Sequence, residues 1–275
     1  PKLPAPSPKE QWSATLKGGG EVLGAYPDLY CNYWEYTYRA DENSDKILCL
    51  KGEFPHCRYF SVSLYNDSTG DVFSGINDQD LVPDAGSKNP FVETTSGKNY
   101  FTIYVVPNGT PESVIKKLGS NVVKVAAGVN KVAIALRQYL GTTADGSQSD
   151  EYAGVELPAI TALDMNLNET PVPEHVASNI DKVTSKVYTQ KSDENREMPF
   201  FLAPVSMYYP NRFTAYLYGR THLRADSVLT FSFIPAPVPT KPEEYKNAVT
   251  RYWSICMGSA SDTRSYVSIN DEKAR

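Results

Sequence analysis

Short runs in which apolar and polar side chains alternate dominate this chain. In residues 58–65 the even positions hold Arg, Phe, Val and Leu, whereas the odd positions hold Tyr and Ser. Residues 100–106, 132–136 and 228–233 alternate in the same way. Alternation with period two, rich in Tyr, Val, Ile, Phe and Thr, is typical of strands half buried in a sheet. Turn-forming stretches such as residues 66–70 separate the runs, so the pattern predicts a mainly β protein.

Two segments show a helical pattern instead. Residues 110–118 begin with Thr-Pro-Glu, which supplies a cap residue, Pro at the first helical position and an acid in the first turn. Residues 173–188 place Val176, Ile180 and Val183 at helical intervals. We therefore expect minor helices beside the strands.

One segment of the chain is repeated 193 residues later. Residues 58–78 align with residues 251–271, and seven of these 21 positions are identical. An upstream echo, Tyr-Thr-Tyr-Arg at 36–39 and Tyr-Leu-Tyr-Gly-Arg at 216–220, supports a duplication. Such self-similarity identifies the structural unit of a fold. It predicts two related antiparallel β-modules, arranged as a sandwich, a barrel or a propeller-like body.

The repeat suggests a division of the chain. Residues 1–20 form a Pro- and Gly-rich N-terminal arm, in which we expect residues 1–8 to be mobile, and residues 21–190 form the first β-module with inserted helices. Residues 191–275 form the second module, which ends soon after its repeat and is apparently incomplete. We expect a C-terminal continuation or a second fragment to complete it. Two packed modules leave a groove where they meet, and this is the expected site.

Composition narrows the class of protein. Hydrophobic residues make up 41% of the 275 residues and charged residues 21%, as in ordinary soluble domains. The net charge of −5 argues against nucleic-acid binding, which needs clustered Lys and Arg. No apolar run approaches the ~18 residues of a membrane span. The chain opens with Pro, and removal of an N-terminal segment would place it in the secretory pathway or outside the cell.

Cysteines and sequons are consistent with that location. Four cysteines allow two disulfides in three pairings, and no pair has the C-x-x-C spacing of zinc or thioredoxin-like sites. Three N-x-[ST] sequons lie in turn-rich stretches where a glycan could be carried. The candidate disulfide residues are Cys31, Cys49, Cys57 and Cys256, and the candidate glycosylation sites are Asn66, Asn108 and Asn168.

Standard catalytic motifs are missing. The sequence contains no G-x-S-x-G, H-E-x-x-H, phosphate-binding loop or dinucleotide fingerprint, so we predict no cofactor and no metal. The acidic stretch 77–80 with Asp84 could offer oxygen ligands to calcium, but loop acids more often bond to turns. Because Asn-Asp recurs in the second copy, a shared structural turn is the favoured interpretation.

Two arginines in matching positions of the copies, Arg58 and Arg251, are the sharpest candidates. Each lies on a predicted strand beside an aromatic residue. One interpretation is that each pairs with a carboxylate and pins neighbouring strands; the other is that one of them polarises a ligand oxygen. The catalytic candidates are Arg251, Tyr252, Arg58, His56 and His222, and the substrate-binding candidates are Tyr59, Tyr65, Trp253, Tyr216 and Tyr218.

Three motifs carry a resemblance to a known family: residues 58–61 (RYFS), 83–91 (PDAGSKNPF) and 251–256 (RYWSIC). They resemble a family of secreted bacterial and fungal proteins over roughly residues 33–256. Within it, the chain is similar to the fungal hetero-Diels–Alderases of tropolone–sesquiterpenoid biosynthesis. That similarity implies a cofactor-free enzyme of the secretory pathway that joins a quinone-methide-like tropolone or phenol to a humulene-type alkene. It assigns no catalytic residue to this chain.

The leading hypothesis is therefore a cofactor-independent cyclase of hetero-Diels–Alder type, a pericyclase, acting on small hydrophobic substrates in an aromatic cavity. A cycloaddition needs two partners held face to face and a donor to the heterodiene oxygen, and it needs no nucleophile. The alternative is a secreted, non-catalytic β-protein that binds a small molecule or carbohydrate. A purely structural protein and a hydrolase are the remaining possibilities.

Overall fold

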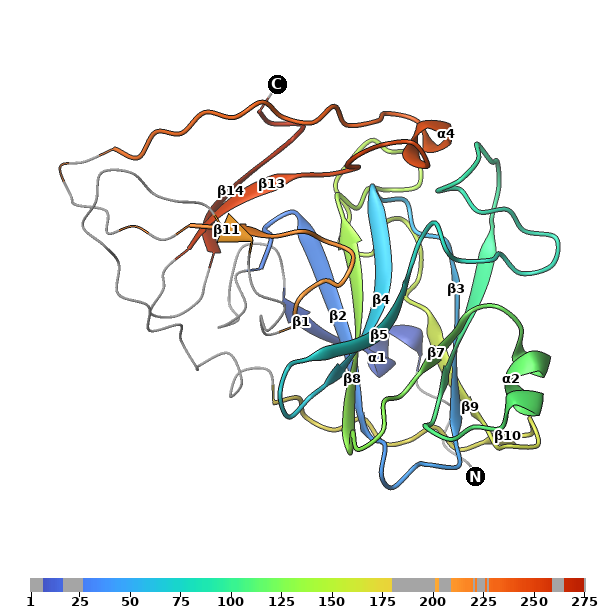
Figure 1. Cartoon of the computed structure of the whole chain (residues 1–275). Helices are drawn as coiled ribbons and strands as arrows, with labels where there is room; N and C mark the ends of the chain where they lie inside the picture. The colour runs from blue at the N-terminus through green and yellow to red at the C-terminus, as the bar shows by residue number, and fades with distance from the viewer. Residues whose placement is uncertain are drawn as a thin grey trace.

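The computed structural model describes residues 7–16, 27–179, 201–202, 209–219, 221, 226, 228–258 and 265–274 (Figure 1). Strands dominate these residues, and the helices are short. The fold is mainly β with several antiparallel sheets and minor helices, as the alternating runs predicted. The described helices are α1 (Pro8–Gln11), α2 (Glu112–Leu118) and α4 (Pro242–Tyr245), and each is too short to cross a membrane.

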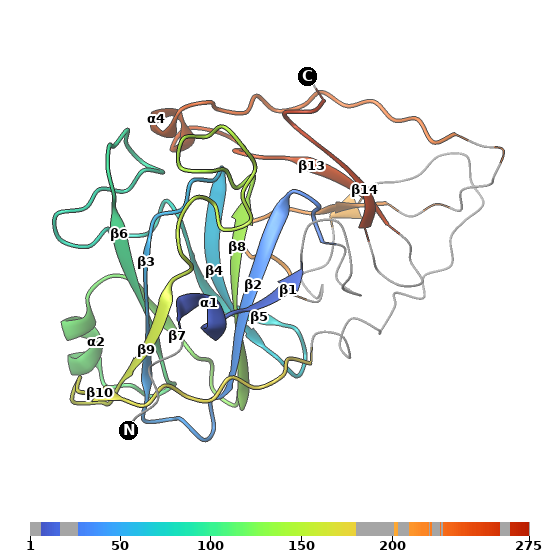
Figure 2. The ribbon, with the colours of Figure 1, turned by 180° about the vertical axis from the view of Figure 1, so that it is seen from behind.

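Two five-stranded sheets form the body of the molecule (Figure 2). Neighbouring strands run antiparallel, except that β6 and β7 are parallel. The first sheet has the order β1 (Ser13–Leu16), β2 (Cys31–Arg39), β8 (Lys131–Tyr139), β4 (Tyr59–Asn66), β5 (Val72–Asn77). The second sheet has the order β10 (Glu169–Thr170), β9 (Ala159–Leu163), β3 (Ile47–Glu53), β6 (Tyr100–Val106), β7 (Val122–Lys124).

The core lies between these two sheets. On β4 the even residues Phe60, Val62 and Leu64 are buried in one cluster with Leu50 and Phe101 of the second sheet. The odd residues of β4 therefore point to the opposite, outer face of the first sheet, because side chains alternate along a strand. The two faces expected for residues 58–65 are confirmed, and so are strands over residues 100–106 and 132–136.

The N-terminal arm is attached to this body where it is described. Trp12 is 4% exposed, and its indole Nε1 donates to the carbonyl of Pro158 at 2.7 Å. Strand β1 then adds to the edge of β2. A buried indole and a paired strand fix residues 12–16, so this part of the arm belongs to the sandwich. Residues 1–6 and 17–20 lie outside the described part.

The prediction of a helix over residues 173–188 is wrong for the part of this range that the structure describes. Residues 171–179 are extended and without regular structure, and residues 180–188 are not described. The Pro-x-Pro sequence at 171–173 favours extended backbone. Tertiary contacts hold it there, because the amide of Val176 donates to the carbonyl of Thr37 at 2.8 Å and Tyr36 donates to the carbonyl of Pro173.

The second copy of the repeat forms a hairpin of its own, β13 (Ser254–Gly258) with β14 (Ser265–Asn270). Its register matches that of β4 and β5 residue by residue: Ser61 faces Asn77, as Ser254 faces Asn270. Both hairpins carry an irregularity at the same place, between Leu64 and Tyr65 and between Met257 and Gly258. The predicted duplication is therefore confirmed as a shared backbone register.

The rest of the second copy is less regular. A two-residue pair joins β11 (Phe201–Leu202) to β12 (Leu217–Tyr218). Residues 228–233, expected as a strand, belong to no strand or sheet in the described part of the chain. Alternation alone does not make a strand, since a sheet ladder needs a neighbour.

Candidate functional site

The two repeat arginines make reciprocal ion pairs between the copies. Arg251 of the second copy contacts Asp78 of the first, Nη2 to Oδ1 at 2.7 Å. Arg58 of the first copy contacts Asp271 of the second, Nη1 to Oδ2 at 3.3 Å, and also Glu272 at 2.6 Å. Both Asp78 and Asp271 are buried. These contacts match the interpretation in which each arginine pairs with a carboxylate and pins strands.

Equivalent tyrosines of the two copies meet on one ring. Tyr59 packs against Tyr139 with ring centroids 5.4 Å apart, and Tyr252 packs against the same ring at 5.0 Å. The phenol of Tyr252 donates to Asp28 at 2.7 Å. At this point the contact between the copies, where we expected a groove, is occupied by packed rings and ion pairs.

The other catalytic candidates are dispersed. His56 is exposed in the loop before β4, and its backbone amide donates to the carbonyl of Ala153 at 2.8 Å. Trp253 packs edge-on against Phe233 at 5.2 Å. Tyr218 belongs to β12, and His222 lies outside the described residues. Among the described residues, the structure does not bring His56, Trp253 and Tyr218 together into one site.

All four cysteines are free thiols, so none of the pairings considered from the sequence is formed. Cys49 lies on the second sheet between the buried residues Leu48 and Leu50, so its side chain points away from the core. Cys31 lies in the first sheet and Cys57 precedes its strand β4, while Cys256 belongs to the second hairpin. Cys49 therefore faces away from the other three.

The sequons and the acidic stretch lie in turns. Asn108 and Asn168 are exposed, whereas Asn66 is partly buried and its Oδ1 accepts the amide of Ser68 at 3.1 Å. In the acidic stretch, Asn77 Oδ1 accepts the amides of Gln79 and Asp80, which is the turn expected from the repeat. No cluster suited to a metal occurs among the residues that the structure describes.

The outer face of the first sheet carries a different group of polar and aromatic residues. Across β2, β8 and β4, Tyr33 faces Arg137, which faces Ser61. The next row on this face holds Glu35, Ala135 and Ser63, and the third holds Thr37, Ala133 and Tyr65. Small residues thus surround the middle of the face, with tyrosines at its margins.

Arg137 is the centre of this face. It is 4% exposed, its Nη2 donates to the carbonyl of Tyr209 at 2.9 Å, and its guanidinium lies 5.5 Å from the ring of Tyr33 and 5.3 Å from that of Tyr65. It makes no ion pair with a carboxylate in the part of the chain that the structure describes, and its buried Nη1 has no hydrogen-bond partner there. A buried cation without a counter-ion costs several kcal/mol.

Three further polar groups near Arg137 are buried without a partner. They are the hydroxyls of Ser61 and Ser63 and the side-chain amide nitrogen of Asn211. Each can donate a hydrogen bond. Such groups are rare in folded proteins and indicate a site for a ligand, an ion or water. We define the Arg137 site by the residues Tyr33, Ser61, Ser63, Tyr65, Arg137, Asn211 and Tyr216.

Residues 209–216 cover the site and are held at both sides. Tyr65 donates to the carbonyl of Pro210 at 2.7 Å, and Tyr59 donates to Asn211 Oδ1 at 3.2 Å. Tyr209 donates to the buried carboxylate of Asp67 at 2.9 Å. Three of the aromatic candidates from the sequence, Tyr59, Tyr65 and Tyr216, are thus brought together by this segment.

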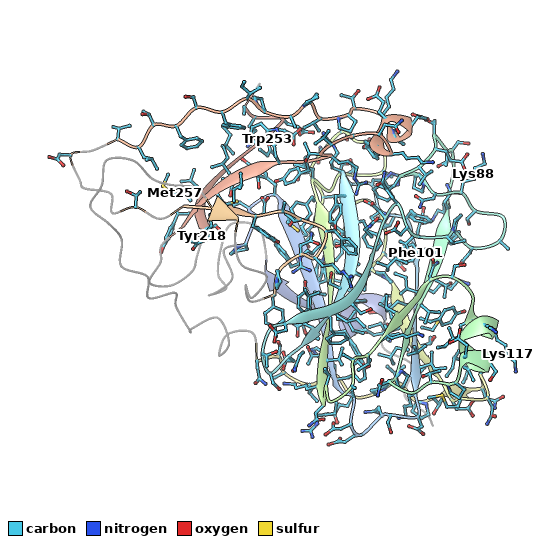
Figure 3. All side chains as sticks on the ribbon, in the orientation of Figure 1. Lys88, Phe101, Lys117, Tyr218, Trp253 and Met257 are labelled. Carbon is cyan, nitrogen blue, oxygen red and sulfur yellow. The ribbon has the colours of Figure 1, made fainter. Side chains whose placement is uncertain are left out.

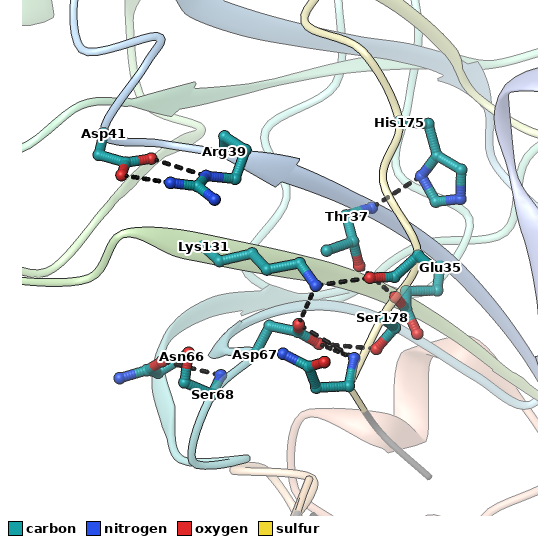
Figure 4. A network of polar contacts seen from close by, with 12 residues as sticks. Glu35, Thr37, Arg39, Asp41, Asn66, Asp67, Ser68, Lys131, His175 and Ser178 are labelled. Carbon is teal, nitrogen blue, oxygen red and sulfur yellow. Dashed lines mark hydrogen bonds and ion pairs between the residues drawn. The ribbon is translucent and has the colours of Figure 1, made fainter. Parts of the chain in front are cut away.

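Asp67 is an anchor for this cover. Its carboxylate accepts Lys131 Nζ at 2.8 Å, Ser178 Oγ at 2.6 Å and the amide of Asn179 at 3.0 Å (Figure 4). Burial alone would raise the pKa of Asp67, but these bonds outweigh it and lower the pKa. The carboxylate is therefore charged at neutral pH and holds residues 178–179 and 209 at the end of β4.

The tyrosines of the site are neutral donors. Burial raises the pKa of Tyr33 and of Tyr65, although Arg137 acts to lower both. Burial raises the pKa of Tyr216 to about 12, again against Arg137. The site therefore combines one fixed positive charge with phenol O–H groups, a combination suited to an anionic or strongly polarised oxygen.

The sequence pattern did not single out Arg137. A usable signal was present, because Arg137 directly follows the apolar run 132–136 at a position that shares its face with Ala133 and Ala135. Comparisons of the chain with protein-family models, with curated proteins and with solved structures gave no match.

Proposed function

We propose that this protein binds a small planar ligand through an anionic or strongly polarised oxygen at the Arg137 site. The observation that carries the proposal is the buried guanidinium, which has an unpartnered Nη1 and no ion pair among the described residues. An acceptor oxygen of the ligand would accept a hydrogen bond from Nη1, and it could also accept hydrogen bonds from the hydroxyls of Ser61 and Ser63. Aromatic walls such as Tyr33 and Tyr65 favour a flat ligand.

The test is the melting temperature of the protein with acetate, which has no ring, with benzoate, which has a six-membered ring, or with tropolone, which has a seven-membered ring. A ligand at about 100 times its dissociation constant adds roughly 2.7 kcal/mol, or roughly 5–10 °C in a chain of this size. Arg137→Met should remove the shift. The variant should fold, because replacing a buried charge by an apolar side chain of similar volume is often neutral or stabilising.

Arg212→Met is the matched control, because it removes the same charge from an exposed position in the covering segment. Its shift should equal that of the unmodified protein. The proposal is wrong if none of the acids shifts the melting temperature, or if Arg137→Met retains the full shift.

A second candidate function is cyclisation at the same site, and a neutral phenol favours it. Tyr216 beside Arg137 offers a donor to an oxygen on which charge develops, as a hetero-Diels–Alder reaction requires. One such donor is worth about 2.7–4 kcal/mol of barrier in other enzymes. The resemblance to the tropolone–sesquiterpenoid enzymes names the partners to try.

A turnover experiment separates the two functions. The protein is incubated with a tropolone quinone-methide precursor and humulene, and the adduct is analysed on a chiral column. An enantiomerically enriched adduct that disappears with Arg137→Met supports the cyclase. A racemic adduct at the background rate, together with the ligand-induced melting shift, leaves binding alone.

A further inference from the structure

The second hairpin lacks two neighbours that its copy in the sandwich possesses. Strand β4 lies between β5 and β8 in the first sheet, whereas β13 pairs with β14 alone in the described part of the chain. Because the registers agree, β14 corresponds to the edge strand β5, and β13 corresponds to the interior strand β4. Among the described residues, one edge of β13 is thus without a neighbouring strand, whereas the same edge of β4 is paired with β8.

The backbone pairing shows which groups face that edge. The amide of Asp271 donates to the carbonyl of Trp253, as the amide of Asp78 donates to that of Phe60. In an antiparallel ladder, hydrogen-bonded positions alternate, so Trp253, Ile255 and Met257 bond toward β14. The N–H and C=O groups of residues 254, 256 and 258 therefore point away from β14. In the first copy, the corresponding residues 61, 63 and 65 pair with β8.

The apolar face of the second hairpin is uncovered as well. Leu64 is fully buried against the second sheet, whereas its counterpart Met257 is 49% exposed. Val267 and Ile269 on β14 are 57% and 39% exposed. Figure 3 shows the contrast, with Phe101 among the side chains of the sandwich and Met257 at the far end of the molecule. An apolar sheet face beside an unpaired edge is a recognised site for strand addition.

We propose that β13 accepts an extended strand from a partner polypeptide, added antiparallel as β8 is added to β4. The duplication defines the chemistry of this strand. On β8, aliphatic Val132, Ile134 and Leu136 point to the core, and small Ala133 and Ala135 point outward. The partner strand should alternate in the same way.

The contacts already made on one face of β13 leave room only for small side chains of the partner strand on that face. Ser254 donates to Asp28 at 2.5 Å, and Cys256 lies beside it on the same face, where its thiol accepts Ser268 Oγ at 3.0 Å. This face is already in contact with residues 28–30, because Tyr30 donates to the carbonyl of Ser268 at 2.9 Å. Bulky partner side chains fit only on the other face, beside Met257 and Ile269. This inference is independent of the Arg137 site.

The test uses a synthetic peptide with the sequence of residues 129–141, added to the whole chain. We expect binding of one peptide per chain and slower hydrogen exchange at the amides of Cys256 and Gly258, by tenfold or more. Two N-methylated peptides supply the control. In β8, Ala133 and Ala135 pair with the outward-facing positions 65 and 63 of β4, so methylation at these two alanines should abolish the protection. Methylation at Ile134 and Leu136 should preserve it, because these amides would face away from β13.

Four results would overturn the proposal. The first is no protection of β13, and the second is equal protection by both methylated peptides. The third is protection of the same amides in the absence of peptide that increases with protein concentration. In that case a second copy of this chain occupies the edge of β13. Protection confined to β4 or β2 would likewise show exchange within the sandwich and contradict docking at β13.

Discussion

Arg58 and Asp271 form an ion pair at 3.3 Å although 213 residues separate them. The counterpart of Arg58 in the second copy is Arg251, and the counterpart of Asp271 in the first copy is Asp78. Arg251 and Asp78 form the other ion pair, at 2.7 Å. Each arginine therefore bonds to the aspartate of the opposite copy. The reciprocal exchange joins the sandwich to the second hairpin through two contacts that arise from one duplicated sequence.

The first prediction concerns this exchange. A double-mutant cycle with Arg58→Met and Asp271→Asn should give a coupling energy of about 1 kcal/mol or more, because Asp271 is buried. A second cycle, Arg58→Met with Asp78→Asn, tests two residues of the same copy. It should give a smaller coupling energy, since these residues are not paired. Free energies of unfolding from urea denaturation measure both. A larger coupling within the copy than between the copies would rule out the exchange.

The second prediction concerns the pH dependence of Arg251→Met. Burial raises the pKa of Asp78, although Arg251 acts to lower it, and without Arg251 the pKa should rise further. The folded variant then holds a proton that the unfolded chain releases near its ordinary pKa of 3.8. Its stability should therefore fall as pH rises above that value, at up to about 1.4 kcal/mol per pH unit. Chemical denaturation between about pH 4 and pH 7 measures this. A loss of stability that is constant over this range would contradict the prediction.

The third prediction concerns Asp67. Its pKa is lowered in the folded state, so its stabilising effect is complete above the ordinary value of 3.8 and is lost as pH falls through the lower folded pKa. Asp67→Asn should cost roughly 3 kcal/mol at neutral pH, because Lys131 loses its buried partner. The difference between variant and unmodified protein should shrink in acid. An exposed control, Asp41→Asn, should change stability little at any pH.

The fourth prediction concerns the cysteines. Burial raises the pKa of the Cys31 and Cys57 thiols, which disfavours the reactive thiolate. Burial also raises the pKa of Cys256, but this residue is exposed and should be alkylated first by iodoacetamide. In denaturant without reductant, mass spectrometry should find four alkylated cysteines. Fewer than four would show a disulfide that the structure does not contain.

Local patterns predicted the strands of the sandwich well, because each has a buried and an outer face. Phe60, Val62 and Leu64 point to the core, as the alternation of apolar and polar residues along this strand predicted. The repeat also predicted the register of a hairpin nearly 200 residues away. Both are consequences of side-chain geometry along a single strand.

Tertiary context decided what the local pattern could not. Residues 173–179 have helical spacing, yet bonds from Thr37 and Tyr36 hold them extended. Residues 228–233 alternate like a strand but have no neighbouring strand in the described part. The Arg137 site depends on three strands and on residues 209–216. Of its residues, only Tyr65 and Tyr216 could be named from their residue type, and Arg137 itself was missed.

The most direct test of the account is an NMR titration that observes the guanidinium of Arg137 while tropolone is added at neutral pH. The account predicts a saturable shift of the Arg137 side-chain nitrogen resonances, absent from Arg137→Met, with the exposed Arg212 resonances unchanged. A titration in which the Arg137 resonances do not move, or move no more than those of Arg212, would contradict it.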